Sequence, residues 1–163
     1  MKAALLFAAS KAPLDVAAGR VALEASADHF ARYGILTIED AAASLVLTTQ
    51  GARALGAGAP INSDDQNLLA TRSARLGDAR LDFAGLQRML ADHDPLPALS
   101  ARLEPLKLIR SLVRKSLLGR ASTLADALPE LSREIALGWV AASRGRPKLA
   151  QTHFGRALEL APD

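Results

Sequence analysis

The sequence contains no cysteine and few aromatic residues. Without cysteine, the 163-residue chain can form neither disulfides nor zinc–thiolate sites, and it carries no thiolate nucleophile. Half of its residues are apolar but only 4% are aromatic, and alanine and leucine dominate, which favours closely packed helices over a β-sandwich. We therefore expect a mainly α fold, and the absence of cysteine fits a cytoplasmic location.

The chain also lacks a long hydrophobic run near its N-terminus. The apolar stretch Ala3–Ala9 is much shorter than the roughly 20 residues of a transmembrane helix, and a signal peptide would need a longer apolar region. We favour a buried strand for this stretch over a targeting segment. Because residues 68–72 could pair with it, the expected fold includes the option of a short two-stranded β element. No membrane insertion is expected.

Neither sign of charge is in large excess. The chain has 20 basic and 17 acidic residues, a net charge of +3. The basic residues gather in two groups on expected helices or at their ends: Lys107, Arg110, Arg114, Lys115 and Arg120, then Arg144, Arg146 and Lys148. No aromatic residue is interleaved with them for base stacking, so a solvated helix face is favoured over a nucleic-acid footprint. We expect no nucleic-acid partner.

Motifs for catalysis and cofactor binding are missing. The segment Gly51–Pro60 holds a lone Gly-x-Gly without the further glycine of a dinucleotide fingerprint, and it is interpreted as a loop. Asp64 and Asp65 are adjacent and diverge in an extended turn, which favours a turn over a metal site. No histidine has a partner at ligand spacing, and no serine lies in a nucleophile elbow. We expect no catalytic, cofactor-binding or metal-binding residues.

Hydrophobic periodicity predicts two helices in the first third of the chain. The first begins at Asp15, which can cap it, and runs to about Tyr33, where Gly34 is suited to a left-handed C-terminal cap. The segment Thr37–Asp40 has the pattern of a capping box, with Asp40 where Glu or Gln is usual. A second helix is therefore expected to continue to about Leu47.

The second half of the chain has a stronger helical pattern. Apolar and basic residues alternate with helical spacing over residues 103–118, and Gly119 is expected to end that helix. A short segment, Leu124–Leu128, precedes Pro129. Two further helices are predicted at Leu131–Ser143 and Pro147–Leu160.

Residues 131–163 resemble a tetratricopeptide (TPR) repeat, a pair of antiparallel helices in 34 positions. In this register Leu137 and Gly138 occupy the Leu-Gly pair and Gly145 the turn between the helices. The second-helix positions are Ala150, Phe154, Ala157 and Pro162. Glu134 and Ala141 depart from the usual tryptophan and tyrosine. Small residues at the crossing let the helices approach, with Phe154 filling the space beneath.

Residues 3–75 resemble the tail of the catalytic domain of bacterial spermidine synthase-like proteins. The resemblance rests on a strand followed by Pro13-Leu14-Asp15, on a helix ending Tyr33-Gly34-Ile35, and on the segment Gly58–Asp65. Ser63 and Asn67 depart from the threonine and proline of the family. It implies that the glycine-rich cofactor turn and the acidic catalytic residue of the family lie upstream and are missing here. Residues 1–80 then form a small α/β or helical subdomain, and 81–163 a helical extension.

Two functions are compatible with these patterns. We favour a non-catalytic helical scaffold or protein–protein interaction module, the C-terminal part of a larger spermidine synthase-like protein. The alternative is a fragment or subunit that completes a polyamine aminopropyltransferase-type enzyme. The TPR resemblance implies these partner-binding residues on the groove side of its first helix: Ser132, Ile135, Trp139, Ala142 and Ser143.

The chemistry of those five positions favours an apolar helix or segment as the ligand. They lack the Lys and Asn pattern that holds a peptide carboxylate, so the expected partner is an apolar segment of another protein or a second copy of the chain. The alternative is that the upstream helix, residues 103–118, already covers Ile135 and Trp139.

Overall fold

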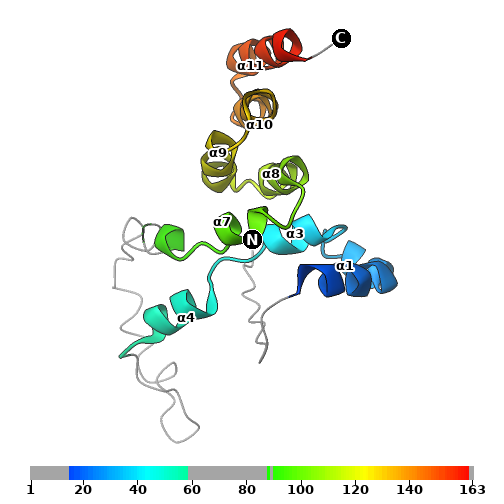
Figure 1. Ribbon diagram of the computed structural model, residues 1–163, viewed down its shortest axis with the longest axis vertical. Coiled ribbons are helices and arrows are strands. Elements are labelled where there is room, and N and C mark those ends of the chain that lie inside the picture. The colour runs from blue at the N-terminus through cyan, green and yellow to red at the C-terminus, as the bar shows by residue number, and fades with distance from the viewer. Residues whose placement is uncertain (1–14, 59–87, 89, 162–163) are drawn as a thin grey trace, which may run out of the picture. The chain divides into compact units, whose positions relative to one another are not determined.

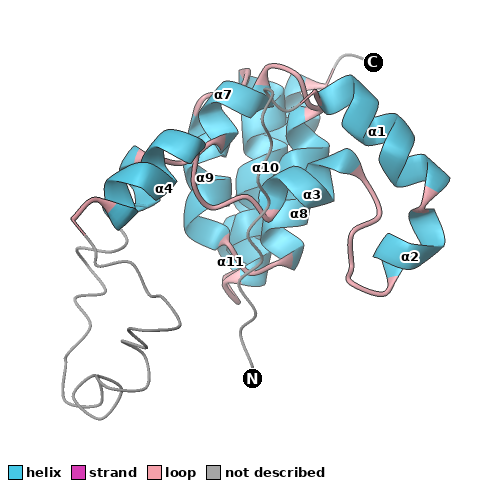
Figure 2. Cartoon of the chain, turned by 90° about the horizontal axis from the view of Figure 1, so that it is seen from below, coloured by secondary structure: helices cyan, strands magenta, loops and turns pink. Residues whose placement is uncertain are grey.

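The computed structural model describes residues 15–58, 88 and 90–161, and the regular elements within these residues are all helices (Figures 1 and 2). The mainly α fold is thereby confirmed, whereas the optional β element, at residues 3–9 and 68–72, lies outside the described residues. The helices are α1 Val16–Ala25, α2 Ala27–Ala31, α3 Ile38–Ala43, α4 Thr49–Gly56, α7 Leu96–Ser100, α8 Pro105–Arg114, α9 Leu118–Asp126, α10 Glu130–Ser143 and α11 Pro147–Leu160. In the described part of the chain, none of them has both the length and the apolar character needed to cross a bilayer.

The described residues fall into two compact units. One is drawn from Met1–Ser44 and Pro97–Asp163, and the other from Leu45–Leu96. The first unit joins helices that are distant in sequence, because α3 packs on α8. The domain boundary expected at residue 80 lies outside the described residues and stays a prediction.

The local signals at the start of the first unit are confirmed. Asp15 caps α1, since its Oδ1 accepts hydrogen bonds from the N–H groups of Ala17 (2.9 Å) and Ala18 (3.3 Å). Gly34 adopts the expected left-handed conformation, with φ 70°. The expected continuous helix to Tyr33 is wrong, however, because Ser26 leaves helical geometry and separates α1 from α2. Only Leu23 is buried in α1, so little packing holds the two helices in line.

Two boundary predictions after Thr37 need correction. The capping box is present, but α3 ends at Ala43 and not at Leu47. The interpretation of Gly51–Pro60 as a loop is also wrong, since residues 49–56 form α4. Thr48 caps this helix by accepting from the N–H of Gly51 at 3.0 Å. Within the second unit, Gly51 also allows close packing, because a Cβ there would lie 2.5 Å from the Cβ of His93.

The amphipathic segment 103–118 is shorter as a helix than its pattern predicts. Helix α8 ends at Arg114, and Ser116 takes the left-handed conformation (φ 59°) that glycine usually supplies. The N–H of Leu117 then bonds to the carbonyl of Leu112 at 2.9 Å, which closes the turn. Gly119 therefore does not end that helix but lies in α9, which also includes the first three residues, 124–126, of the short segment expected at Leu124–Leu128.

Helices α8 to α11 form a stack of helical hairpins (Figure 1). Helix α10 contacts α8, α9 and α11, and α8 contacts α9 as well as α3. Ile109 and Leu112 of α8, Ala125 of α9 and Ala136 of α10 are buried in this core. Each helix therefore buries one face against its neighbours, as in repeat architectures.

The last hairpin, α10 and α11, is confirmed within one residue at each boundary. At Gly138 the two helices approach so closely that an added Cβ would lie 2.4 Å from Cε1 of Phe154. Gly145 supplies the left-handed turn between them, with φ 68°. The hairpin therefore depends on glycine at the helix crossing, where no larger side chain fits.

Candidate functional site

Asp40 is a buried carboxylate that joins α3 to α8. Its Oδ2 accepts the N–H groups of Leu36 (3.0 Å) and Thr37 (3.1 Å), while Oδ1 accepts from the hydroxyl of Ser111 at 2.6 Å and from the guanidinium of Arg114. Burial raises the pKa of Asp40, but the hydrogen bonds from Ser111, Arg114 and Leu36, with the charge of Arg114, outweigh it and lower the pKa to about 2. Asp40 is therefore ionised and structural.

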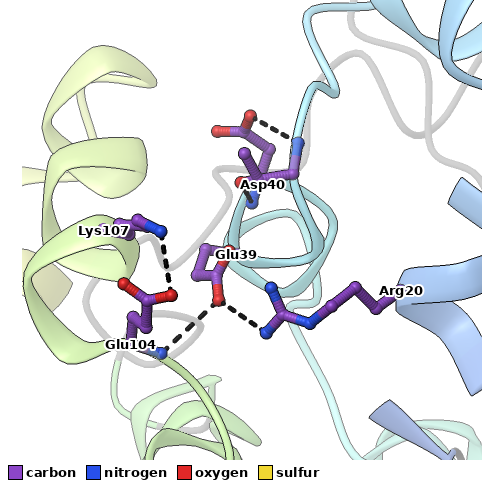
Figure 3. Close-up of polar contacts among 6 residues, drawn as sticks. Arg20, Glu39, Asp40, Glu104 and Lys107 are labelled. Atoms are coloured by element: carbon purple, nitrogen blue, oxygen red, sulfur yellow. Dashed lines mark hydrogen bonds and ion pairs between the residues drawn. The ribbon is translucent and has the colours of Figure 1, made fainter. Parts of the chain in front are cut away.

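Glu39, the preceding residue, is also fully buried and lies between α1 and α8 (Figure 3). Its Oε1 accepts from Arg20 of α1 at 3.2 Å and from the backbone N–H of Glu104 at 3.4 Å. Glu104 is the N-cap residue of α8 and makes no side-chain cap, so Glu39 places a negative charge at that helix start, where the helix dipole favours it. Its Oε2 has no hydrogen-bond partner among the described residues.

A second buried acid joins the terminal helices. Glu134 of α10 is 4% exposed, and its Oε2 lies 2.7 Å from Nδ1 of His153 on α11. The hydrogen bond with His153 is the main cause that lowers the pKa of Glu134, against the opposing effect of burial. In the register expected from the TPR resemblance, Glu134 is the residue that stands where tryptophan is usual. His153 is thus engaged within the hairpin.

An open depression with a volume of about 420 Å³ lies between α8 and α10. We call it the Trp139 depression, and its lining residues are Arg110, Val113, Arg114, Trp139, Ala142 and Ser143. Trp139 is partly buried, whereas Ala142 and Ser143 are exposed. The depression therefore combines an indole, small side chains and two guanidinium groups on one surface.

Three of the five residues expected to bind a partner meet in this depression. Trp139, Ala142 and Ser143 line it, while Ser132 and Ile135 are partly buried and do not. The upstream helix α8 packs against α10 but leaves the depression open, so it covers Trp139 only in part. A partner-binding role for the five residues stays a prediction.

Sequence reasoning missed the two arginines of this surface. The basic residues of α8 were interpreted as a solvated face because no aromatic residue is interleaved with them in the sequence. The fold brings Arg110 and Arg114 into the same depression as Trp139. The absence of an interleaved aromatic residue therefore did not indicate that Trp139 lines the same depression as these charges. The only available signal was that both helices are amphipathic, which does not tell which side chains share a surface.

Two other features of the described residues were candidates for a site: a second depression and possible metal ligands. A second open depression, of about 310 Å³, has Arg20 and Arg102 beside the start of α1. Within residues 15–58, 88 and 90–161, no group of three acidic or histidine side chains could hold a metal ion. The adjacent Asp64 and Asp65 lie outside the described residues.

Comparison with known proteins finds no counterpart. No protein-family model matches the chain, and no curated protein or solved structure shows significant similarity to it.

Proposed function

We propose that this chain is a non-catalytic protein-interaction module of stacked helical hairpins, which binds its partner at the Trp139 depression. The observation that carries the proposal is the meeting of Trp139, Ala142 and Ser143 in one open depression. Tryptophan is enriched among the residues that dominate binding energy in protein interfaces. The partly buried indole of Trp139 already borders an open depression, so the helices need not rearrange before a partner binds to it. Binding occurs on a preformed surface.

A structural role for the buried acids supports the non-catalytic part of the proposal. Asp40 and Glu134 are each engaged with a side chain of another helix, and Glu39 contacts two other helices. These contacts account for the burial of Asp40 and Glu134 without a substrate, whereas Oε2 of Glu39 has no hydrogen-bond partner among the described residues. We further propose that the α10–α11 hairpin is a TPR-type repeat and that the chain is the C-terminal part of a larger bacterial spermidine synthase-like protein, located in the cytoplasm.

Selection from a random peptide library displayed on phage tests the proposed function. We expect peptides to be enriched on the wild-type chain and not on Trp139→Ala, because the variant loses the central anchor. Ala142→Gln serves as a second variant, since Ala142 is exposed and a longer side chain would fill the depression without disturbing the core. Both variants should keep the helical circular dichroism of the wild type.

Two outcomes of the selection would contradict the proposal. One is that the wild-type chain enriches no peptide. The other is that the wild type, Trp139→Ala and Ala142→Gln enrich the same peptides, which would place binding elsewhere on the molecule.

A further inference from the structure

From the charges around the Trp139 depression, we infer that the partner segment carries a carboxylate next to an apolar side chain. This inference rests on the proposed function and specifies its ligand. The apolar side chain packs on Trp139 and Ala142, and the carboxylate lies beside Arg110. The sequence alone favoured an apolar helix or segment, because the five expected positions lack the Lys and Asn pattern that holds a carboxylate. The structure adds Arg110 and Arg114 to this surface.

Arg110 supplies the unpaired charge of the surface. It is exposed and forms no hydrogen bond or ion pair with another described residue. Lys107, one turn earlier on α8, is instead paired with Glu104 at 2.8 Å. No acidic side chain lines the depression. A basic ligand would therefore be repelled there, and a ligand carboxylate would find a guanidinium that is free to pair in bidentate geometry.

Arg114 contributes a second guanidinium that is held in place. Its side chain is 48% exposed, yet it is bound to the buried carboxylate of Asp40, which also accepts from Ser111. The carboxylate of Asp40 offsets most of the charge of Arg114. The depression therefore has one positive charge without an acidic partner among the described residues, on Arg110, and one set of hydrogen-bond donors held in place, on Arg114. Because the fixed group has little freedom left to lose, its remaining N–H donors can bind a ligand at low entropic cost.

The size of the surface favours a peptide over a nucleic acid. Binding to a phosphate backbone usually depends on a track of cations with several stacking platforms. Here a single indole and two arginines line a depression of about 420 Å³, and one of the arginines is already paired. One carboxylate beside one apolar group matches that arrangement.

The test uses tryptophan-free peptides from the phage selection, synthesised in two forms, with the selected acidic residue or with its amide counterpart. Emission from Trp139, the only tryptophan of the chain, reports binding directly. At about 150 mM salt, where charges are screened beyond ~8 Å, we expect the amide peptide to bind about fivefold more weakly to the wild type. Arg110→Gln should bind the acidic peptide about fivefold more weakly.

The effects of the amide peptide and of Arg110→Gln on the affinity should not be additive, because each change removes the same ion pair between the peptide carboxylate and Arg110. Arg110→Gln is therefore expected to bind the acidic and amide peptides almost equally. Lys148→Gln is the matched control, since Lys148 is exposed and does not line the depression. It removes one positive charge elsewhere on the unit and should leave the affinity and the preference for the acidic peptide unchanged.

Several results would overturn the inference. If the selected peptides lack acidic residues, or if Arg110→Gln behaves like Lys148→Gln, the ligand class is wrong while the proposed surface stands. If no peptide depends on Trp139, the proposed function itself fails. If a single-stranded oligothymidylate displaces the peptide and loses affinity in Arg110→Gln, the surface binds nucleic acid. If dilution alone shifts the Trp139 emission, its occupant is a second copy.

Discussion

Gly138→Leu is expected to lower the free energy of unfolding by about 3 kcal/mol or more. Even a single Cβ at this position would lie 2.4–2.8 Å from three ring atoms of Phe154, well inside van der Waals contact. The ring is packed between α10 and α11, so either the ring or the helix crossing must shift. Urea denaturation followed by circular dichroism gives the difference from the wild type.

A second glycine provides the matched control. Gly155 lies in α11, and a Cβ built there meets nothing within 4 Å. Gly155→Ala should therefore leave stability unchanged or raise it by roughly 0.5–1 kcal/mol, because alanine restricts the unfolded chain and favours the helix. In a double-mutant cycle, Gly138→Leu should also lower the free energy of unfolding much less in the Phe154→Ala background than in the wild type, because the clashing ring is absent. Equal losses for the variants at Gly138 and Gly155 would contradict the hairpin geometry.

Asp40→Asn is expected to lower the free energy of unfolding by about 2–4 kcal/mol. The substitution keeps the shape but turns one accepting oxygen into an amide donor. That donor must face either the N–H groups of Leu36 and Thr37 or the side chains of Ser111 and Arg114. Asp126→Asn is the control, since Asp126 is exposed at the end of α9, and it should change stability by less than about 0.5 kcal/mol.

The pH dependence of the stability difference between the wild type and Asp40→Asn shows how much of it is due to the charge of Asp40. The folded pKa of Asp40 is lowered from 3.8 to about 2, so its contribution is fully present above pH 3.8 and is lost as the pH falls towards 2. Protonation there removes roughly 2 kcal/mol from the wild type. The variant has no charge at this position to lose. The gap between the wild type and Asp40→Asn should therefore narrow between pH 4 and pH 2 as measured by urea midpoints, and a constant gap would show that the charge is irrelevant.

The parts of the fold that sequence predicts are those with local causes. The caps at Asp15 and Thr37 act within three residues, and the spacing of Gly138, Gly145 and Phe154 defines one hairpin. Predictions failed where a residue acted against its usual preference. Ser116 takes a left-handed conformation at the end of α8, although Gly119 was expected to end that helix, and Gly51 lies inside a helix where close packing on His93 requires it.

Only the α10 side of the candidate site was expected from the sequence, because its α8 side depends on tertiary packing. Trp139, Ala142 and Ser143 were expected from the TPR resemblance, but Arg110 and Arg114 reach the same surface only through the packing of α8 on α10. The contact of Asp40 with Arg114 joins residues 74 positions apart, and no periodicity encodes it. Amphipathic patterns tell which face is polar, whereas tertiary packing decides which polar faces meet.

The emission of Trp139 tests the interaction surface most directly. In the free chain at low concentration, we expect a red-shifted emission from Trp139, because the indole borders an open depression. Adding the selected peptide should shift the emission to the blue until binding saturates. The shift should be absent when the peptide is added to Ala142→Gln. A blue emission in the free chain that neither peptide nor protein concentration changes, together with a monomeric mass, would mean that Trp139 is an ordinary core residue and that the chain has no docking surface there.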